Sequence, residues 1–139
     1  MKKNESVTKI MSTEVVTVHQ RQKLSDVRHI ICKSDIHHVP VADGKKLVGL
    51  ISYTDLMKLN IVVSGADERT IDAIIDQQFT IKEVMVTELT TLKETNTIRE
   101  ATKILAEGKF HSVPVIDKKN QIVGIVTMTD LIRYLNSQY

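Results

Sequence analysis

The chain has 139 residues, 42% hydrophobic and 26% charged side chains, and a net charge of +2. This length accommodates one moderate hydrophobic core. The small net charge, the scattered basic residues and the 4% of aromatics argue against a nucleic-acid-binding surface. No stretch approaches the roughly 18 apolar residues that span a bilayer, and the N-terminal residues lack the apolar run of a signal peptide. We therefore expect a cytoplasmic protein with no membrane or nucleic-acid partner.

The first half of the chain predicts a β-α-β-β-α order from its periodicity and turn signals. Apolar residues recur at helical spacing from Leu24 onward, and Asp43-Gly44 is a hairpin signal between two apolar runs. Pro40 cannot donate to a ladder hydrogen bond, which predicts a strand start or a sheet edge at that position. The expected elements are a strand at 15–18, a helix at 24–34, strands at 39–42 and 47–51, and a helix from about Tyr53 to Val63.

The second half predicts the same order after a linker helix. Asp67 can cap a helix in which Ile71, Ile74 and Ile75 share a face. That face is expected to pack on the body of the domain or on a second subunit. Thr97 with Glu100 forms a capping box, and Gly108 is placed to end the helix that follows. The remaining expected elements are a strand near 89–92, a helix at 98–108, strands at 112–116 and 121–126, and a helix at 128–137.

The two halves are copies of one unit. Residues 7–43 recur at 81–117, and residues 48–56 recur at 123–131, with a one-residue slip in the turn between these blocks. We expect a first repeat at 1–65, a linker helix at 66–79 and a second repeat at 80–139, together forming one module. Each repeat of this size is marginal alone, so ligand clefts are expected beside a pseudo-twofold axis.

One motif in each repeat combines a helix start with a carboxylate. Ser52-x-x-Asp55 and Thr127-x-x-Asp130 each follow a Gly-containing apolar strand. The free N–H groups at a helix start suit a phosphate, and a carboxylate can accept two hydrogen bonds from a cis-diol. The alternative is purely structural, because both motifs are also capping boxes. The two roles are compatible if the hydroxyl caps the helix and the aspartate binds a ligand.

A β-α-β-β-α unit with x-V-P-V-x-D at its second strand and G-h-h-[ST]-x-[ST]-D before its last helix resembles the CBS domain. Here the motifs are His38–Asp43 with Gly49–Asp55, and Ser112–Asp117 with Gly124–Asp130. Two in tandem resemble a Bateman module. The resemblance implies an α/β (α+β) fold in which two pseudo-twofold-related repeats pack through their sheets. It also implies a non-catalytic sensor that binds AMP, ADP, ATP or S-adenosylmethionine between the repeats, with no covalent cofactor.

The resemblance implies which positions contact the ligand. The aspartates would hold the ribose, the preceding Ser and Thr residues would contact ribose or phosphate, and the histidine positions would face phosphates. The ligand-binding residues implied are Ser52, Thr54, Asp55, Thr127, Thr129, Asp130, His37, His38, His111, Ser112, Thr13, Val15, Val16, Thr87 and Leu89. The resemblance places Val15, Val16 and Leu89 on the adenine side of the ligand. For each of these residues, packing in the hydrophobic core is the alternative interpretation.

The histidines leave several interpretations open. His37, His38 and His111 fit phosphate contacts, but they also fit ordinary polar positions at a strand start. A metal site made from these histidines is a less favoured interpretation, because His37 and His38 are adjacent and the side chains of adjacent strand residues point to opposite faces. Since Ser112 replaces His38 in the second copy, the two clefts are not equivalent. A polyphosphate would need charge from histidines, helix ends, Lys109, Arg133 or an accompanying Mg²⁺.

The sequence also bears on two other function classes. A structural or dimerisation module with vestigial clefts is the main alternative, suggested by the apolar face at Leu131, Ile132 and Leu135. We expect a homodimer and an effector protein as partners. An enzyme is not expected, because no nucleophile elbow, zinc-protease, P-loop or C-x-x-C motif occurs. The single cysteine, Cys32, fits a buried inert thiol better than a redox centre.

Overall fold

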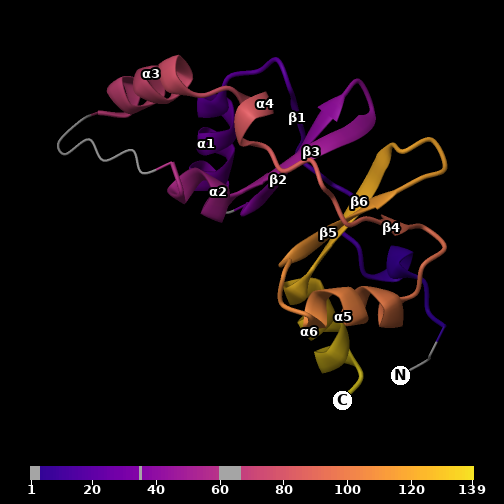
Figure 1. The fold of residues 1–139 in the computed structure, drawn as a ribbon. Helices are drawn as coiled ribbons and strands as arrows, with labels where there is room; N and C mark the ends of the chain where they lie inside the picture. The colour runs from indigo at the N-terminus through magenta and orange to yellow at the C-terminus, as the bar shows by residue number, and fades with distance from the viewer. Residues whose placement is uncertain (1–3, 35, 60–66) are drawn as a thin grey trace. The chain divides into compact units, whose positions relative to one another are not determined.

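The computed structural model describes residues 4–34, 36–59 and 67–139 (Figure 1). The first copy and the linker contain η1 (Val7–Lys9), β1 (Val18–His19), α1 (Leu24–Lys33), β2 (His38–Asp43), β3 (Lys46–Ser52), α2 (Tyr53–Met57) and α3 (Glu68–Gln78). The second copy contains α4 (Ile81–Val84), β4 (Leu92–Lys93), α5 (Ile98–Ala106), β5 (Ser112–Ile116), β6 (Ile122–Thr127) and α6 (Met128–Ser137). None of the described helices combines the length and apolar character needed to cross a bilayer.

The predicted mixture of helices and strands is confirmed, with two three-stranded sheets ordered β1-β2-β3 and β4-β5-β6. In each sheet the first pair is parallel, and β5 pairs with β6 antiparallel. The first strand of each copy is shorter and lies later than expected, because residues 15–17 and 89–91 are not strand. The helix expected from Tyr53 ends at Met57, and the residues from 60 to Val63 lie outside the described residues.

The expectation that Pro40 lies at a strand start or on an edge is wrong, since it is the third residue of the central strand β2. Its counterpart Pro114 in β5 shows the physical reason. Pro114 lies opposite Ile125, whose N–H and C=O instead bond Ser12 on the other side of β6. The pairing with β4 starts one residue later, at Val115. No ladder partner therefore needs the N–H that proline lacks.

The chain folds as two compact units that do not coincide with its two repeats. Unit 1 contains the residues up to 15, residues 45–47 and residues 90–139; unit 2 contains residues 16–44 and 48–89. The segment that opens each repeat therefore belongs with the body of the other repeat. Two isolated antiparallel bridges mark this exchange: Ser12 pairs with Ile125 of β6, and Val86 pairs with Leu50 of β3.

A methionine from each exchanged segment fills the space left by a strand glycine. A Cβ added at Gly124 would lie 2.9 Å from Cγ of Met11, and one added at Gly49 would lie 2.8 Å from Cγ of Met85. Met11 and Met85 are partly buried against the cores of units 1 and 2, respectively. Both methionines therefore contribute to core packing, and the glycines are required by the close approach.

Unit 2 buries apolar residues from its sheet, from α1 and from the linker. Cys32 of α1 was expected to be buried and is instead exposed. Leu24 and Ile81 are both 0% exposed, and Ile75 of α3 is 5% exposed in the same cluster. The linker helix is thus ordered, and its Ile face packs on the body of the unit, which is the first of the two predicted alternatives. Asp67 caps α3 by accepting a hydrogen bond from the Thr70 N–H at 2.9 Å, as predicted.

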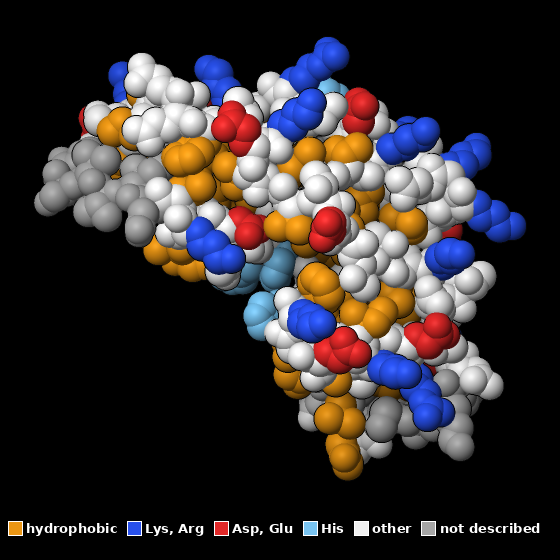
Figure 2. All heavy atoms as spheres, viewed as in Figure 1, with side chains coloured by type: hydrophobic (Ala, Val, Ile, Leu, Met, Phe, Trp, Pro, Cys, Tyr) orange, Lys and Arg blue, Asp and Glu red, His pale blue; other side chains and the backbone are white. Residues whose placement is uncertain are grey.

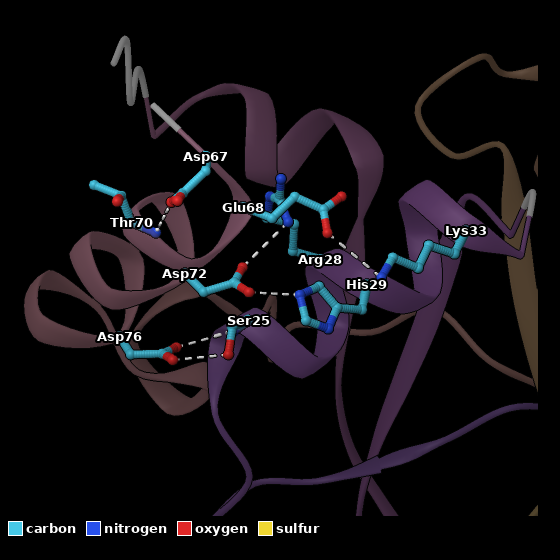
Figure 3. Close-up of polar contacts among 9 residues, drawn as sticks. All are labelled: Ser25, Arg28, His29, Lys33, Asp67, Glu68, Thr70, Asp72 and Asp76. Carbon is cyan, nitrogen blue, oxygen red and sulfur yellow. Dashed lines mark hydrogen bonds and ion pairs between the residues drawn. The ribbon is translucent and has the colours of Figure 1, made fainter. Parts of the chain in front are cut away.

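Polar contacts also join α3 to α1 (Figure 3). Asp76 accepts bonds from the N–H and hydroxyl of the buried Ser25, at 3.0 and 2.7 Å. Asp72 contacts Nη1 of Arg28 at 3.1 Å and Nε2 of His29 at 2.6 Å. Because Glu68, Asp72 and Asp76 are spaced by four residues, they lie on one face of α3. This acidic face lies against donors of α1.

The N-terminal segment packs into the hydrophobic core of unit 1. Val7 is 0% exposed and belongs to the cluster that contains Leu92, Leu105 and Val113. Its N–H donates to the carbonyl of Asn96 at 3.0 Å, and the Ile98 N–H donates to the carbonyl of Glu5 at 2.8 Å. The Tyr134 hydroxyl of α6 donates to the Glu5 carboxylate.

Candidate ligand-binding site

The two candidate aspartates occupy equivalent positions at helix starts. Ser52 caps α2 and Thr127 caps α6, and each accepts a hydrogen bond from the N–H of the aspartate three residues later, at 3.2 and 3.1 Å. Oδ2 of Asp55 and of Asp130 returns to the N–H of the capping residue, at 2.8 Å in both. The predicted capping boxes are therefore confirmed in both copies.

The cap uses only one oxygen of each carboxylate. Within the described residues, Oδ1 of Asp55 and Oδ1 of Asp130 have no hydrogen-bond partner, and both residues are half-buried. Thr54 and Thr129, which precede them, are exposed. Each helix start thus presents a fixed carboxylate oxygen beside an exposed hydroxyl, an arrangement suited to accepting hydrogen bonds from a ligand diol.

The exchange of segments decides which of the residues predicted to lie on the adenine side share a unit with which aspartate. Thr13 follows the Ser12 bridge and belongs to unit 1 with Asp130, and Val15 is in the same unit. Thr87 follows the Val86 bridge and belongs to unit 2 with Asp55. Leu89 and Val16 also belong to unit 2. A repeat-by-repeat assignment from the sequence would have placed Thr13 beside Asp55.

His37 and His111 lie immediately before β2 and β5, and their carbonyl groups bond the first residue of α2 and of α6. The carbonyl of His37 accepts the Tyr53 N–H at 2.8 Å, and the carbonyl of His111 accepts the Met128 N–H at 3.2 Å. Both side chains are exposed, whereas His38 is half-buried at the start of β2. No group of three or more His, Cys, Asp or Glu suited to a metal ion occurs in the described parts of the chain.

Two residues that sequence reasoning missed complete this region. The Tyr53 ring meets the His37 ring edge-on, with centroids 6.1 Å apart and an interplanar angle of 86°. In unit 1 the equivalent Met128 places its sulfur 3.3 Å from Nδ1 of His111. Both are large apolar side chains exposed at the first position of a helix, 46% for Tyr53 and 40% for Met128.

The copies differ at the residue that opens the second strand. Ser112 of β5 is 3% exposed, and its hydroxyl has no hydrogen-bond partner among the described residues. Its counterpart in the first copy is His38. A buried hydroxyl without a partner is uncommon, and a bound water or ligand is one ordinary way to satisfy it.

The family model of the CBS domain matches residues 7–61 and 81–137. The chain belongs to the CBS domain family. The predicted resemblance is thus confirmed in both copies, and the two matches cover most of the chain. Their limits follow the sequence repeats rather than the compact units, because each CBS domain match begins in the segment that is exchanged.

Solved structures of CBS domain pairs share the fold. The CBS domain pair of protein MJ0100, in complex with 5′-methylthioadenosine and S-adenosyl-L-methionine, is 27% identical with a TM-score of 0.77, covering 96% of this chain and 98% of that one. CBSX2 in complex with AMP is 20% identical with a TM-score of 0.80, covering 96% and 98%. The second similarity concerns the fold alone.

Curated relatives include longer proteins. The CBS domain-containing protein YhcV of Bacillus subtilis is 27% identical over 126 residues, which is 91% of this chain and 82% of YhcV. The uncharacterized protein MJ1232 of Methanocaldococcus jannaschii is 29% identical over 126 residues. The chain spans 38% of MJ1232 and 47% of the related protein MJ1225, so it covers less than half of these archaeal relatives.

Proposed function

We propose that this CBS domain pair is a non-catalytic regulatory module that binds an adenosine-containing ligand through Asp55 and Asp130. The proposal rests on one observation, which is that the two oxygens of each carboxylate have different hydrogen-bond partners. One oxygen fixes the side chain through the capping box, and the other has no partner in the described residues. A carboxylate held in this way can accept two ribose hydroxyls without losing further side-chain freedom.

The family supports the ligand class. The CBS domain pair of MJ0100, 27% identical to this chain, was crystallised with two adenosine derivatives. The exposed hydroxyl of Thr54 lies next to Asp55 in the chain, and that of Thr129 lies next to Asp130. Thr13 belongs to the same unit as Asp130, and Thr87 belongs to the same unit as Asp55. The remaining implied contacts at His37, His38, His111 and Ser112 belong to this proposal. So does Mg²⁺ as a companion of a polyphosphate ligand.

Isothermal titration calorimetry with AMP, ADP, ATP and S-adenosylmethionine tests the proposal. Asp55→Asn and Asp130→Asn keep an oxygen able to accept the capping N–H but replace the other oxygen by a donor. We expect each variant to weaken binding in its own unit by at least tenfold and the double variant to abolish it. Glu100→Gln is the matched control, because Glu100 forms the same capping box with Thr97 at a helix that carries no candidate site. Unchanged binding in the double variant would contradict the proposal.

A dimerisation module is the second candidate function, and a specific observation favours it. Along α6, Met128, Ile132 and Leu135 are 40%, 63% and 41% exposed at helical spacing. Figure 2 shows hydrophobic side chains at the surface over this helix. Ile132→Glu should convert a dimer to a monomer in light scattering at micromolar concentration. A protein that stays monomeric at every concentration, and binds adenosine ligands, would leave only the sensor function.

A further inference from the structure

The N-terminal segment contacts one part of unit 1 at two places. Residues 5–13 are here named the strap, and β6 with α6 is named the arm. Ser12 of the strap exchanges two backbone hydrogen bonds with Ile125 of β6, at 2.9 and 3.0 Å. At the other end of the strap, the Glu5 carboxylate accepts a hydrogen bond from the Tyr134 hydroxyl of α6. In the sequence of the arm, Asp130 lies between these two contacts.

The two contacts enclose the candidate site of unit 1. Ile125 lies two residues before Thr127, which caps α6, and Tyr134 lies four residues after Asp130. Since residues four apart share one face of a helix, the face that carries the aspartate also carries the contact with Glu5. Thr13 directly follows the Ser12 bridge. The strap therefore fixes both the arm and the position of Thr13 within unit 1.

The equivalent positions in unit 2 are apolar. Continuing the alignment of the two copies outward by a few residues places Phe79 at the position of Glu5 and Leu59 at the position of Tyr134. Both are partly buried hydrophobic residues that pack against the core of unit 2. A polar contact thus stands in unit 1 where unit 2 has apolar packing.

The contact of Glu5 with Tyr134 can break at a lower cost than apolar packing. Water replaces a hydrogen bond, whereas withdrawing Phe79 or Leu59 from a core would expose apolar surface. Glu5 also lies 3.3 Å from Nζ of Lys9 in the strap, so the carboxylate keeps an ionic partner after the bond to Tyr134 breaks. Because release of the whole strap also withdraws the fully buried Val7 from the core, the closed state predominates.

We propose that Glu5 and Tyr134 form a latch that holds the strap closed, and that a ligand at Asp130 and the closed strap stabilise each other. This inference rests on the proposed adenosine site. A ligand that contacts both Thr13 and Asp130 binds the closed state more tightly than the open one, and it shifts the equilibrium by that difference. The coupling is reciprocal, so the latch also regulates the site. Glu5 and Tyr134 are positioning residues, because they act through the strap and α6.

Hydrogen exchange of the full chain, followed by NMR, tests the latch. The Val7 and Ser12 N–H groups, bonded to the carbonyls of Asn96 and Ile125, report release of the strap. Tyr134→Phe keeps the ring and removes the donor. Without ligand, both amides should then exchange at least about threefold faster, because a hydrogen bond to a charged group is lost. Unchanged exchange of both amides in this variant would overturn the latch.

Two controls separate the latch from a general loss of stability. Thr102→Val also removes a hydroxyl donor from unit 1, but this hydroxyl bonds the Ile98 carbonyl within α5. The exchange of the two strap amides should be unchanged in this variant. In Tyr134→Phe, exchange of the Val86 N–H, which bonds the Leu50 carbonyl in unit 2, should also be unchanged. Equal acceleration of the strap amides by Tyr134→Phe and Thr102→Val would overturn the latch.

The coupling is tested in Asp55→Asn, which leaves Asp130 as the remaining candidate site. S-adenosylmethionine or AMP is added at about 100 times the dissociation constant from calorimetry, which slows opening about 100-fold if only the closed state binds. We expect at least about tenfold slower exchange of the Val7 and Ser12 amides, and no slowing once Asp130→Asn is added. Ligand binding at Asp130 that leaves strap exchange unchanged would overturn the coupling and leave the proposed function standing. Failure of the wild type to bind any adenosine ligand would overturn the proposed function and the coupling together.

Discussion

Units 1 and 2 follow one backbone plan but differ in the polar contacts that are added to it. In both, a methionine-bearing segment bridges the last strand and fills the space above a glycine. Unit 2 adds the helix α3, which charged and hydrogen-bonded side chains attach to α1. Unit 1 instead attaches its N-terminal segment mainly through backbone hydrogen bonds. The comparison indicates that the duplicated plan depends on apolar fit and strand pairing, whereas the polar attachments have diverged.

Ile81→Ala offers the strongest test of the exchange itself. Ile81 opens the second repeat in sequence but is fully buried in the core of unit 2. Removing a buried isoleucine side chain costs about 2–5 kcal/mol of unfolding free energy. We expect hydrogen exchange to accelerate in α1, β2 and β3 and to change little in α5 and β5. Val7→Ala is the counterpart, and should affect α5 and β5 instead. Acceleration confined to the repeat that carries each substitution would contradict the exchange.

Gly124→Val and Gly49→Val test whether the two glycine–methionine contacts are equivalent. The added side chain would meet Met11 or Met85, and at Gly124 it would also lie against the Ser12 carbonyl, 3.1 Å from the new Cβ. Overpacking of this kind costs about 1–3 kcal/mol. Urea denaturation should show partial rescue of Gly124→Val by Met11→Ala, and of Gly49→Val by Met85→Ala. Absence of rescue in both pairs would show that the methionines are not what excludes a side chain.

Asp72→Asn tests the polar attachment of α3 to α1 in unit 2. Asp72 is 20% exposed at its side chain and contacts both Arg28 and His29. Loss of the carboxylate charge should lower the unfolding free energy by about 1–2 kcal/mol, the range for hydrogen bonds to charged groups reduced by partial exposure. Glu68→Gln is the control, because Glu68 and Lys33 are about 60% exposed and 3.6 Å apart, and it should have almost no effect. Equal losses of unfolding free energy in the two variants would contradict the conclusion that Asp72 attaches α3 to α1.

The smallest effect expected is a difference in pH response between the units. Hydrogen bonds from Thr70, its backbone N–H first and its hydroxyl second, lower the pKa of Asp67. A lowered pKa stabilises the fold above the unfolded-state pKa, near 3.8, and this contribution is lost as pH falls through the folded-state value. In unit 1, the hydrogen bond to Glu5 raises the pKa of Tyr134, and this contribution is lost only as pH rises through the raised value, above 10.

Thermal melting across pH separates these two contributions. The difference in melting temperature between wild type and Asp67→Asn should be largest at neutral pH and shrink on acidification. The difference between wild type and Tyr134→Phe should be constant to pH 9 and shrink above pH 10. A Tyr134→Phe difference that disappears on acidification would place its origin in the protonation of Glu5.

Much of the local structure followed from local sequence signals. The helices α1, α5 and α6 begin and end within two residues of the predicted limits, because amphipathic periodicity and capping residues act within a few positions. The caps at Ser52 and Thr127 formed as predicted for the same reason. The first strands were misplaced, since each makes only two ladder pairs and its length depends on a distant partner.

The candidate site was predictable in part. The paired aspartates and the duplicated motif identified the family and both helix starts, which the family match confirms. The contacts of Tyr53 with His37 and of Met128 with His111 could not be predicted, because the partners are 16 or 17 positions apart. The sequence also could not predict that Thr13 shares a unit with Asp130 and Thr87 with Asp55, because this depends on which strand each exchanged segment pairs with.

The duplication, the order of elements, the capped helix starts and the CBS domain family could all be inferred from the residues alone. These properties are set by periodicity, turn residues and repeated motifs, all of which operate over short separations. That residues opening one repeat complete the core of the other became visible in the three-dimensional fold alone. Strand bridges between residues more than 30 positions apart fix this arrangement, and the choice of partner depends on packing that no local pattern records.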